Sequence, residues 1–282
     1  MNYKIVVPEL VSLETSLDRV RGFYLLKKLN YFGNSKNKLK FHFKVAIDDK
    51  IKVPSGYDFR NSRYQVKNNI WTYNLSKFGL KFTFQYDYFK KDFRYSPMMN
   101  KIPIRLNWTY PIGDHIADLI NLDLFLNKVV ILNGIAFRLK GKIYVFCAPS
   151  QNGKTIFLKR NKETIEEIIS DDYVAVDLIN KKVASTPLLG KGKNKLSENW
   201  YPVEKINLLV NSVNDDKQII FTVREFVKMS ATKFFNNIFI KNLIFYYHLE
   251  KEIDDILDKI ALSDIFEITN IKNYDYEQLF RS

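Results

Sequence analysis

Cysteine is nearly absent from this chain of 282 residues, in which Cys147 is the single example. One thiol cannot form a disulfide within the chain, so a disulfide-stabilised secreted scaffold is excluded. Histidine is also scarce: no two of His42, His115 and His248 stand at the spacing of zinc ligands. No Ser-His-Asp set suggests itself either, so triad hydrolase chemistry has no support in the sequence.

Long apolar runs are missing as well. No stretch of about 18 apolar residues occurs, and the N-terminal MNYKIVVPEL has a short apolar segment that ends at Glu9. We therefore expect a soluble, cytoplasmic protein with no secretory signal and no membrane contact. Glycine and proline are few, at 10 and 8, whereas 46% of the residues are hydrophobic, which is enough to bury one large core or two modest ones.

Acidic residues are the minority among the charges: 44 Lys and Arg residues against 31 Asp and Glu residues give a formal net charge of +13. A strong positive charge is one signal of nucleic-acid binding, because lysines that neutralise phosphates release counterions. Here the basic residues are spread along the whole chain. We favour a solvated basic surface over a nucleic-acid stripe, and an acidic peptide is an alternative partner.

The first hundred residues have the alternating pattern of half-buried strands. It occurs in LKFHFKVAI (39–47), IWTYNL (70–75) and LKFTFQYDYF (80–89), and SKFG (76–79) is expected to connect the last two as a hairpin. A short helix is expected near residues 17–29. We predict a mainly antiparallel, strand-rich subdomain over residues 1–110, whose aromatic residues are core rather than a base-stacking platform.

A second domain is expected over residues 111–282, after a segment with three prolines and a glycine at 94–114. It should open with a helix capped by Asp114 that carries Ile116, Leu119, Ile120 and Leu124 on one face. Two strands, VVILNGIAFRLK (129–140) and IYVFCAPS (143–150), follow around a tight KGK turn. Apolar residues at helical spacing over 226–260 predict one or two helices that pack on the sheet.

The second of these strands leads directly into APSQNGKT, residues 148–155, and the following TIFLKR predicts a short helix. In a G-x-x-x-x-G-K-[ST] loop, backbone N–H groups surround phosphate oxygens, the lysine meets the outer phosphates and the hydroxyl holds Mg²⁺. We therefore predict a nucleotide site; its residues are Ser150, Gln151, Asn152, Gly153, Lys154 and Thr155.

Two adjacent carboxylates, Asp171 and Asp172, follow an apolar segment 17 and 18 residues after Lys154. Paired carboxylates at the end of a strand can coordinate Mg²⁺ and take a proton from an attacking hydroxyl. Beside the loop, we favour this reading over a solvated Asp-Asp turn.

These residues together resemble the HPr kinase/phosphorylase-like protein kinases. The matching segments are ILNGIAFRLKGKIYVFCAPSQNGKTIF (131–157), IISDDYVAVDL (168–178), STPLLGKGKNKLSENWYPVEKINLLV (185–210) and LSDIFEITN (262–270). The resemblance implies an α/β (mixed α+β) fold of the phosphoenolpyruvate-carboxykinase-like P-loop type, with a mixed sheet and flanking helices. It also implies ATP and Mg²⁺ as cofactors and phosphate transfer to a Ser or Thr hydroxyl.

The same resemblance implies roles for single residues. Lys154 would contact the outer phosphates and Thr155 the metal, while Asp171 and Asp172 would serve the metal and the acceptor hydroxyl, in an order that stays open. Asn133 stands where the family has a histidine, so it can form hydrogen bonds there but cannot act as a base. Ala148 and Gln151 replace two loop glycines.

The primary hypothesis is an ATP-dependent kinase that acts on a hydroxyl of a peptide or small protein, with a ribosomal precursor peptide as one candidate. A small-molecule hydroxyl is an alternative acceptor. A degenerate nucleotide-binding protein that regulates a partner is the second hypothesis, and nucleic-acid binding is the third. Exposed sheet edges of the N-terminal subdomain could bind an extended peptide, and homo-oligomerisation is left open.

Overall fold

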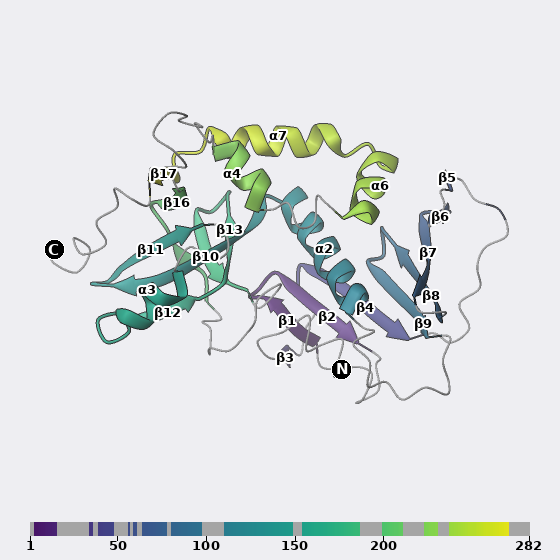
Figure 1. Cartoon of the computed structure of the whole chain (residues 1–282), viewed down its shortest axis with the longest axis horizontal. Coiled ribbons are helices and arrows are strands. Elements are labelled where there is room, and N and C mark those ends of the chain that lie inside the picture. Colours follow the sequence, from purple (N-terminus) through teal and green to yellow (C-terminus); the bar gives the residue numbers. More distant parts are fainter. Residues whose placement is uncertain are drawn as a thin grey trace. The chain divides into compact units, whose positions relative to one another are not determined.

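The computed structural model describes two mixed sheets and a small number of helices, a mixed α/β architecture (Figure 1). The described residues are 3–15, 34–35, 39–47, 56, 59–60, 64–77, 80–97, 110–148, 154–186, 199–210, 223–230 and 237–270. The chain divides into two compact units, Met1–Asp114 and His115–Ser282. The helix expected at 17–29 and residues 187–198 of the segment at 185–210 lie outside the described residues.

The first unit holds a nine-stranded sheet in the order β3-β1-β2-β4-β9-β8-β7-β6-β5. Its strands are β1 (Tyr3–Val7), β2 (Val11–Thr15), β3 (Asn34–Ser35), β4 (Phe41–Ile47), β5 (Phe59–Arg60), β6 (Tyr64–Lys67), β7 (Ile70–Lys77), β8 (Leu80–Asp87) and β9 (Asp92–Pro97). The pairs β2–β4 and β4–β9 are parallel, and the other pairs are antiparallel. β7 and β8 pair as far as Lys77 and Leu80, so pairing extends into the expected SKFG connection.

One face of this sheet is aromatic. Strand register places six side chains of β6 to β9 on the same face, because residues opposite each other in an antiparallel pair share a face. All six are at most 6% exposed: Tyr64, Trp71, Tyr73, Phe84, Tyr86 and Phe93. Tyr86 and Phe93 stack with ring centroids 4.3 Å apart. These rings form core, as the sequence predicts, and are not an exposed platform for bases.

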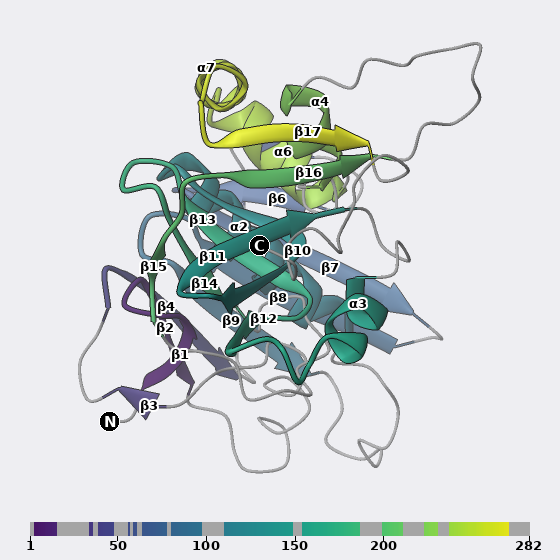
Figure 2. The same cartoon turned by 90° about the vertical axis from the view of Figure 1, so that its left-hand side faces the viewer.

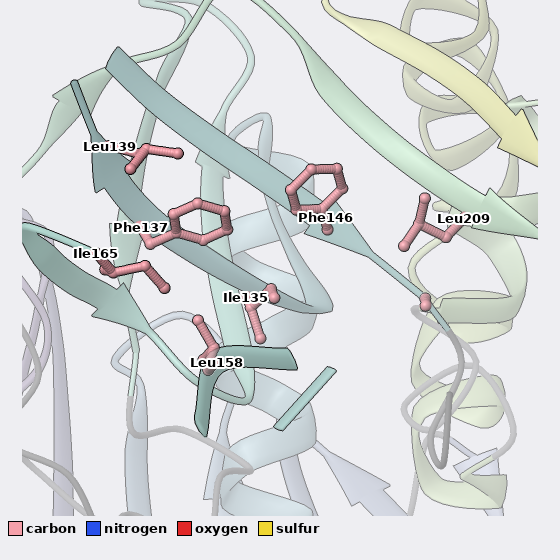
Figure 3. Packing of buried hydrophobic residues seen from close by; sticks show 8 residues of the cluster. Ile135, Phe137, Leu139, Phe146, Leu158, Ile165 and Leu209 are labelled. Atoms are coloured by element: carbon pink, nitrogen blue, oxygen red, sulfur yellow. The ribbon is translucent and has the colours of Figure 1, made fainter. Parts of the chain in front are cut away.

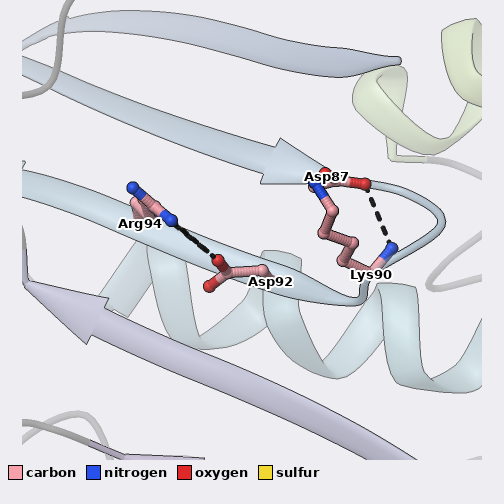
Figure 4. A network of polar contacts seen from close by, with 4 residues as sticks. All are labelled: Asp87, Lys90, Asp92 and Arg94. Carbon is pink, nitrogen blue, oxygen red and sulfur yellow. Dashed lines mark hydrogen bonds and ion pairs between the residues drawn. The ribbon is translucent and has the colours of Figure 1, made fainter. Parts of the chain in front are cut away.

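The turn between β8 and β9 is held by charged residues that pair locally (Figure 4). Asp87 accepts a hydrogen bond from the Lys90 backbone N–H at 3.0 Å and forms an ion pair with the Lys90 ammonium at 3.0 Å. Arg94 and Asp92 both lie on β9 and form an ion pair with an N–O distance of 3.3 Å. The loop thereby closes a hairpin between strands whose residues Asp87 and Asp92 face each other.

The second unit is built on an eight-stranded sheet in the order β15-β14-β13-β10-β11-β16-β17, with β12 paired to β10 (Figure 2). Its elements are α2 (Tyr110–Leu126), β10 (Val129–Leu139), β11 (Lys142–Cys147), α3 (Lys154–Arg160), β12 (Glu167–Ser170), β13 (Tyr173–Asp177), β14 (Lys182–Ser185), β15 (Tyr201–Pro202), β16 (Ile206–Val210), α4 (Val223–Ser230), α6 (Ile238–Tyr246), α7 (Glu250–Ala261) and β17 (Phe266–Asn270). β11, β16 and β17 run parallel, and the remaining pairs are antiparallel.

Helix α2 begins at Tyr110, so the expectation that Asp114 caps it is wrong. Pro111 is the second residue of the helix, where its missing N–H has no intrahelical acceptor and its fixed φ suits a helix. The expected apolar face is buried, with Ile116, Leu119 and Ile120 at most 1% exposed.

The region 226–260 forms three helices within the described residues, α4, α6 and α7, rather than one or two. Asn237 begins α6: its Oδ1 accepts the Phe239 N–H at 2.9 Å, and its Nδ2 donates to Asp118 Oδ2 of α2 at 2.6 Å. Helix α4 is tied to α7 by ion pairs from Arg224 to Asp254 and Asp258. α3 and α7 lie on opposite sides of the sheet (Figures 1 and 2).

Helix α3 is fixed to the sheet by a buried apolar cluster (Figure 3). β10 contributes three alternate residues, Ile135, Phe137 and Leu139, and β11 contributes Phe146 and Ala148. Leu158 from α3, Ile165 and Leu209 complete it. This packing sets the position of the first residue of α3 relative to the end of β11.

Candidate functional site

The predicted strand, loop and helix order is present. β10 and β11 form a hairpin whose two turn residues, Lys140 and Gly141, have φ values of +50° and +72°, as a tight two-residue turn requires. β11 ends at Cys147, and α3 starts at Lys154. The predicted phosphate-contacting residues Ser150, Gln151, Asn152 and Gly153 lie between them, outside the described residues, as does the side chain of Thr155.

The two aspartates lie between β12 and β13, which form one antiparallel ladder with β10. The pairs Asn133–Tyr173 and Ala136–Ser170 belong to the same register, so Asp172 falls opposite Gly134. A register shift between Ala136 and Phe137 bends the ladder just before this point, and such bulges often re-aim side chains near functional sites. Asp171 and Asp172 thus follow strand β12, as predicted. They lie in a bend between β12 and β13, both of which pair with β10.

Hydrogen bonds hold this bend tightly. The Gly134 N–H donates to the Asp172 carbonyl at 2.9 Å, and the buried Ser170 hydroxyl donates to the Tyr173 carbonyl at 2.6 Å. The Thr186 N–H donates to the same Tyr173 carbonyl at 3.3 Å. The backbone of the two carboxylate-bearing residues is therefore fixed against β10 and β14.

Asn133 and Gly134 stand in the middle of the arrangement, with the aspartates on one side and the end of β11 on the other. The Ala148 N–H donates to the Asn133 carbonyl at 3.0 Å. A Cβ on Gly134 would lie 2.8 Å from Cys147 Sγ and 3.0 Å from the Phe146 carbonyl oxygen, so no larger residue fits without displacement. The glycine permits the close approach of β10 and β11 at this point.

Lys154 turns back onto the end of β11, where its Nζ donates to the Ala148 carbonyl oxygen at 2.8 Å. Burial lowers the pKa of its ammonium group, and negative charge on the Cys147 sulfur or the Asp172 carboxylate opposes that shift. An anion placed beside the Lys154 ammonium would favour its charged form in the same way.

Cys147 is a buried neighbour of this lysine that the sequence alone did not connect with the site. Burial raises the pKa of its thiol to about 12, and the Lys154 charge opposes the shift. The thiol is thus neutral at physiological pH and acts here as a small packing group rather than a nucleophile.

Asn133 carries an unsatisfied buried atom. Among the described residues, Asn133 Oδ1 is a buried side-chain oxygen with no hydrogen-bond donor. Asp92 Oδ1 and Ser185 Oγ share this condition, but the other Asp92 oxygen accepts from Arg94, and Ser185 lies two strands away from β10. Of these three, Asn133 is the one whose backbone is joined to Ala148 at the end of β11.

Three of the predicted site residues carry side-chain oxygens that could bind Mg²⁺. Two carboxylates and a hydroxyl, from Asp171, Asp172 and Thr155, are oxygen ligands of the kind that Mg²⁺ accepts, with water and nucleotide phosphates completing its shell. In the part of the chain that the structure describes, no group of three or more His, Cys, Asp or Glu side chains could hold a metal by itself. The chemistry of the two carboxylates is compatible with a Mg²⁺ ion whose other ligands come from outside the protein.

A second polar chain, which sequence reasoning missed, crosses the sheet of the first unit. The Leu39 N–H donates to Ser12 Oγ at 3.1 Å, Ser12 Oγ lies 3.0 Å from His42 Nδ1, and His42 Nε2 lies 3.2 Å from Glu14 Oε2. It has the residue types of a hydrolase triad. Ser12 is fully buried, however, and its oxygen already accepts from Leu39, so it is no accessible nucleophile.

No family model, no curated protein and no solved structure matches this chain. None of the described helices is long and apolar enough to cross a membrane. The family resemblance of the loop, the Asn-Gly pair and the Ser-Asp-Asp bend stays a prediction from sequence.

Proposed function

We propose that this protein is an ATP-dependent kinase that transfers the γ-phosphoryl group to a Ser or Thr hydroxyl of a peptide or small protein. The observation that carries the proposal is that two distant segments meet at Asn133 and Gly134 of β10: the end of β11, where Lys154 Nζ donates to the Ala148 carbonyl, and the bend in which Asp172 accepts from the Gly134 N–H. The proposal includes the phosphoenolpyruvate-carboxykinase-like P-loop fold for the second unit and a cytoplasmic location.

Each residue has a task in this proposal. Lys154 would leave the Ala148 carbonyl and bind the outer phosphates, which compensates an ammonium charge that burial disfavours. Ser150, Gln151, Asn152 and Gly153 would present backbone N–H groups to the phosphates. Mg²⁺·ATP supplies the electrophilic phosphorus and neutralises its charge. Thr155 and one aspartate would hold the metal, and the other aspartate would receive the proton of the acceptor hydroxyl.

Calorimetry with Mg²⁺·ATP tests the nucleotide site directly. We expect Lys154→Ala to weaken binding at least about 30-fold, because a charge-assisted contact to phosphate is lost. Lys159→Ala is the matched control, since Lys159 is an exposed lysine of the same helix, and its affinity should stay that of the wild type. Equal binding by wild type and Lys154→Ala would contradict the site.

A second function, nucleotide binding that regulates a partner without catalysis, is favoured by one feature: Asn133 cannot exchange a proton near neutral pH. The aspartates separate the two functions. In a kinase, turnover requires both aspartates, so Asp171→Asn and Asp172→Asn should each abolish it. In a regulator, binding depends on Lys154 and no turnover exists to lose.

A further inference from the structure

Helices α3 and α7, on opposite sides of the sheet in the second unit, belong to segments of opposite charge (Figures 1 and 2). α7 carries five acidic residues and two lysines. The segment from Arg138 to Lys162, which includes α3, has no acidic residue. Its seven basic residues are Arg138, Lys140, Lys142, Lys154, Lys159, Arg160 and Lys162. Basic residues are spread along the whole chain, but here no acidic residue is interspersed with them.

The end of α3 is tied to the tip of the β10–β11 hairpin. The Ile165 N–H donates to the Asn161 carbonyl at 3.1 Å, which closes the turn after the helix. The Glu166 N–H donates to the Arg138 carbonyl at 3.0 Å, and the Glu166 carboxylate accepts the Gly141 N–H at 3.0 Å. The helix end, the turn and the hairpin tip are thereby held together in one region.

Three exposed cations lie in this region. Lys142 is paired with Leu139 across the hairpin, and opposite residues of an antiparallel pair share a face of the sheet. Leu139 packs in the buried cluster that contains Leu158 of α3, so Lys142 lies on the α3 side. Arg160 ends α3, and Lys162 follows in the turn. We call Lys142, Arg160 and Lys162 the basic surface.

Local structure accounts for only part of this charge. A cation in the last turn of a helix interacts favourably with the helix dipole, which explains Arg160. Lys142 and Lys162 lie outside the helix, and neither forms an ion pair with an acidic side chain of the described residues. The neighbouring Glu167 is already paired with Arg138 at 3.3 Å. The basic surface therefore retains capacity for an anionic partner.

An acidic peptide matches this surface better than a nucleic acid does. Ile156 is 57% exposed and precedes Arg160 by four residues, so the two share one face of α3. Single-stranded nucleic acids stack their bases on open aromatic rings. The aromatic residues here, Tyr144 and Phe157, are partly buried and pack against Phe137 with centroids 5.7 and 5.6 Å away. Carboxylates and an apolar side chain would match the cations and Ile156.

We propose that the basic surface, together with Ile156, binds an acidic segment of a partner peptide or protein that also contains an apolar side chain. The inference does not depend on phosphate transfer, because none of these four residues has a task in the proposed chemistry. It assigns a contact region to the positive charge of the chain, which sequence analysis leaves as a solvated surface.

Fluorescence anisotropy of a labelled peptide tests the proposal; the peptide consists of glutamates around one leucine and is titrated with the full chain without nucleotide. We expect the double variant Lys142→Glu/Lys162→Glu to weaken binding about 10-fold at low ionic strength. The matched control is Lys251→Glu/Lys259→Glu, which changes the net charge equally at two exposed lysines of α7. Its affinity should stay within about twofold of that of the wild type.

Ile156→Ser is a second variant that leaves the charge unchanged, and we expect it to weaken binding about threefold through the lost apolar contact. Melting temperatures close to that of the wild type would show that the variants are folded. Equal weakening by the two double variants overturns the proposal, because net charge alone would then attract the peptide. Absence of binding by the wild type, or tighter binding of an oligodeoxythymidine than of the peptide, overturns it as well. None of these results bears on Mg²⁺·ATP binding, so the proposed function is tested separately.

Discussion

The two units each place a polar cluster on neighbouring strands, and the clusters differ in how well they are satisfied. In the first unit, Leu39, Ser12, His42 and Glu14 form a continuous chain of contacts of 3.0 to 3.2 Å. In the second unit, Lys154 Nζ donates to the neutral Ala148 carbonyl just after β11, and Asn133 Oδ1 has no donor among the described residues.

The chain of contacts in the first unit is complete in itself, and this completeness identifies it as structural in spite of its triad-like residue types. Ser12 accepts from Leu39, so its own proton is available for His42 Nδ1, and His42 Nε2–H can then donate to Glu14. Every position in that chain is filled from within the protein. In the second unit, by contrast, one buried acceptor, Asn133 Oδ1, has no donor among the described residues.

The largest effect should come from closing the space between β10 and β11. Gly134→Ala places a Cβ 2.8 Å from Cys147 Sγ and 3.0 Å from a backbone oxygen, so we expect a loss of about 2–3 kcal/mol in unfolding free energy. Denaturant unfolding measures it. Adding Cys147→Ala should restore part of the loss, because one of the two close contacts disappears.

Gly141→Ala is the matched control for that experiment. No atom lies within 4 Å of its added Cβ, and the expected cost comes only from the positive φ of +72°, at about 1–2 kcal/mol. If Gly134→Ala is tolerated as well as an ordinary surface change, the tight approach that positions Asn133 beside Ala148 is not a constraint on the site.

The strands and the helix that carry both clusters were predictable from sequence, but the contacts between these elements were not. Alternation predicts the strand that contains His42, and TIFLKR after the Gly-Lys-Thr motif predicts the short helix α3. The contact of Ser12 with His42 depends on parallel pairing of β2 with β4, which no local pattern specifies. The placement of Asp172 opposite Gly134 likewise depends on the register of a ladder formed by three strands.

The start of helix α2 was likewise not predictable from local sequence signals. The sequence offers Asp114 as a good capping residue, yet α2 begins before Pro111, because proline is also well tolerated in the first turn. Local signals of equal strength compete there, and tertiary packing decides between them. Asn133 could be identified by resemblance alone, since an unsatisfied oxygen is a property of the packed structure.

A stability loss of intermediate size should distinguish the hydrogen-bonded cluster of the first unit from the cluster around Asn133. Ser12→Ala removes the acceptor of the buried Leu39 N–H and a partner of His42, so we expect a loss of about 1–3 kcal/mol in stability. Asn133→Ala, measured beside it, should cost less, because its Oδ1 has no hydrogen bond to lose among the described residues. Hydrogen exchange at the Leu39 amide would report the loss locally. Equal costs for the two variants would remove the distinction between the clusters.

The smallest expected effect is a change of unfolding free energy with pH, which tests whether water reaches Cys147 in the second cluster. Burial raises the pKa of the Cys147 thiol from 9.0 to about 12, so above pH 9 the unfolded chain loses a proton that the folded chain keeps. The unfolded state then binds fewer protons, and stability falls as pH rises, by up to about 1.4 kcal/mol per pH unit. Cys147→Ala lacks this loss. It should be less stable than wild type by about 1 kcal/mol at pH 7 and equal to it near pH 10.

Urea unfolding in reducing buffer between pH 7 and 10.5 would measure this crossing. Ser12→Ala is the control, because the chain of Ser12, His42 and Glu14 contains no group that ordinarily titrates above pH 9, and its stability should run parallel to that of wild type. Parallel curves for Cys147→Ala would mean that the thiol titrates alike in the folded and unfolded chain. Water would then reach the end of β11, and Lys154 beside it would not be desolvated. Only the contact of Lys154 Nζ with the Ala148 carbonyl would then support an anion at that lysine.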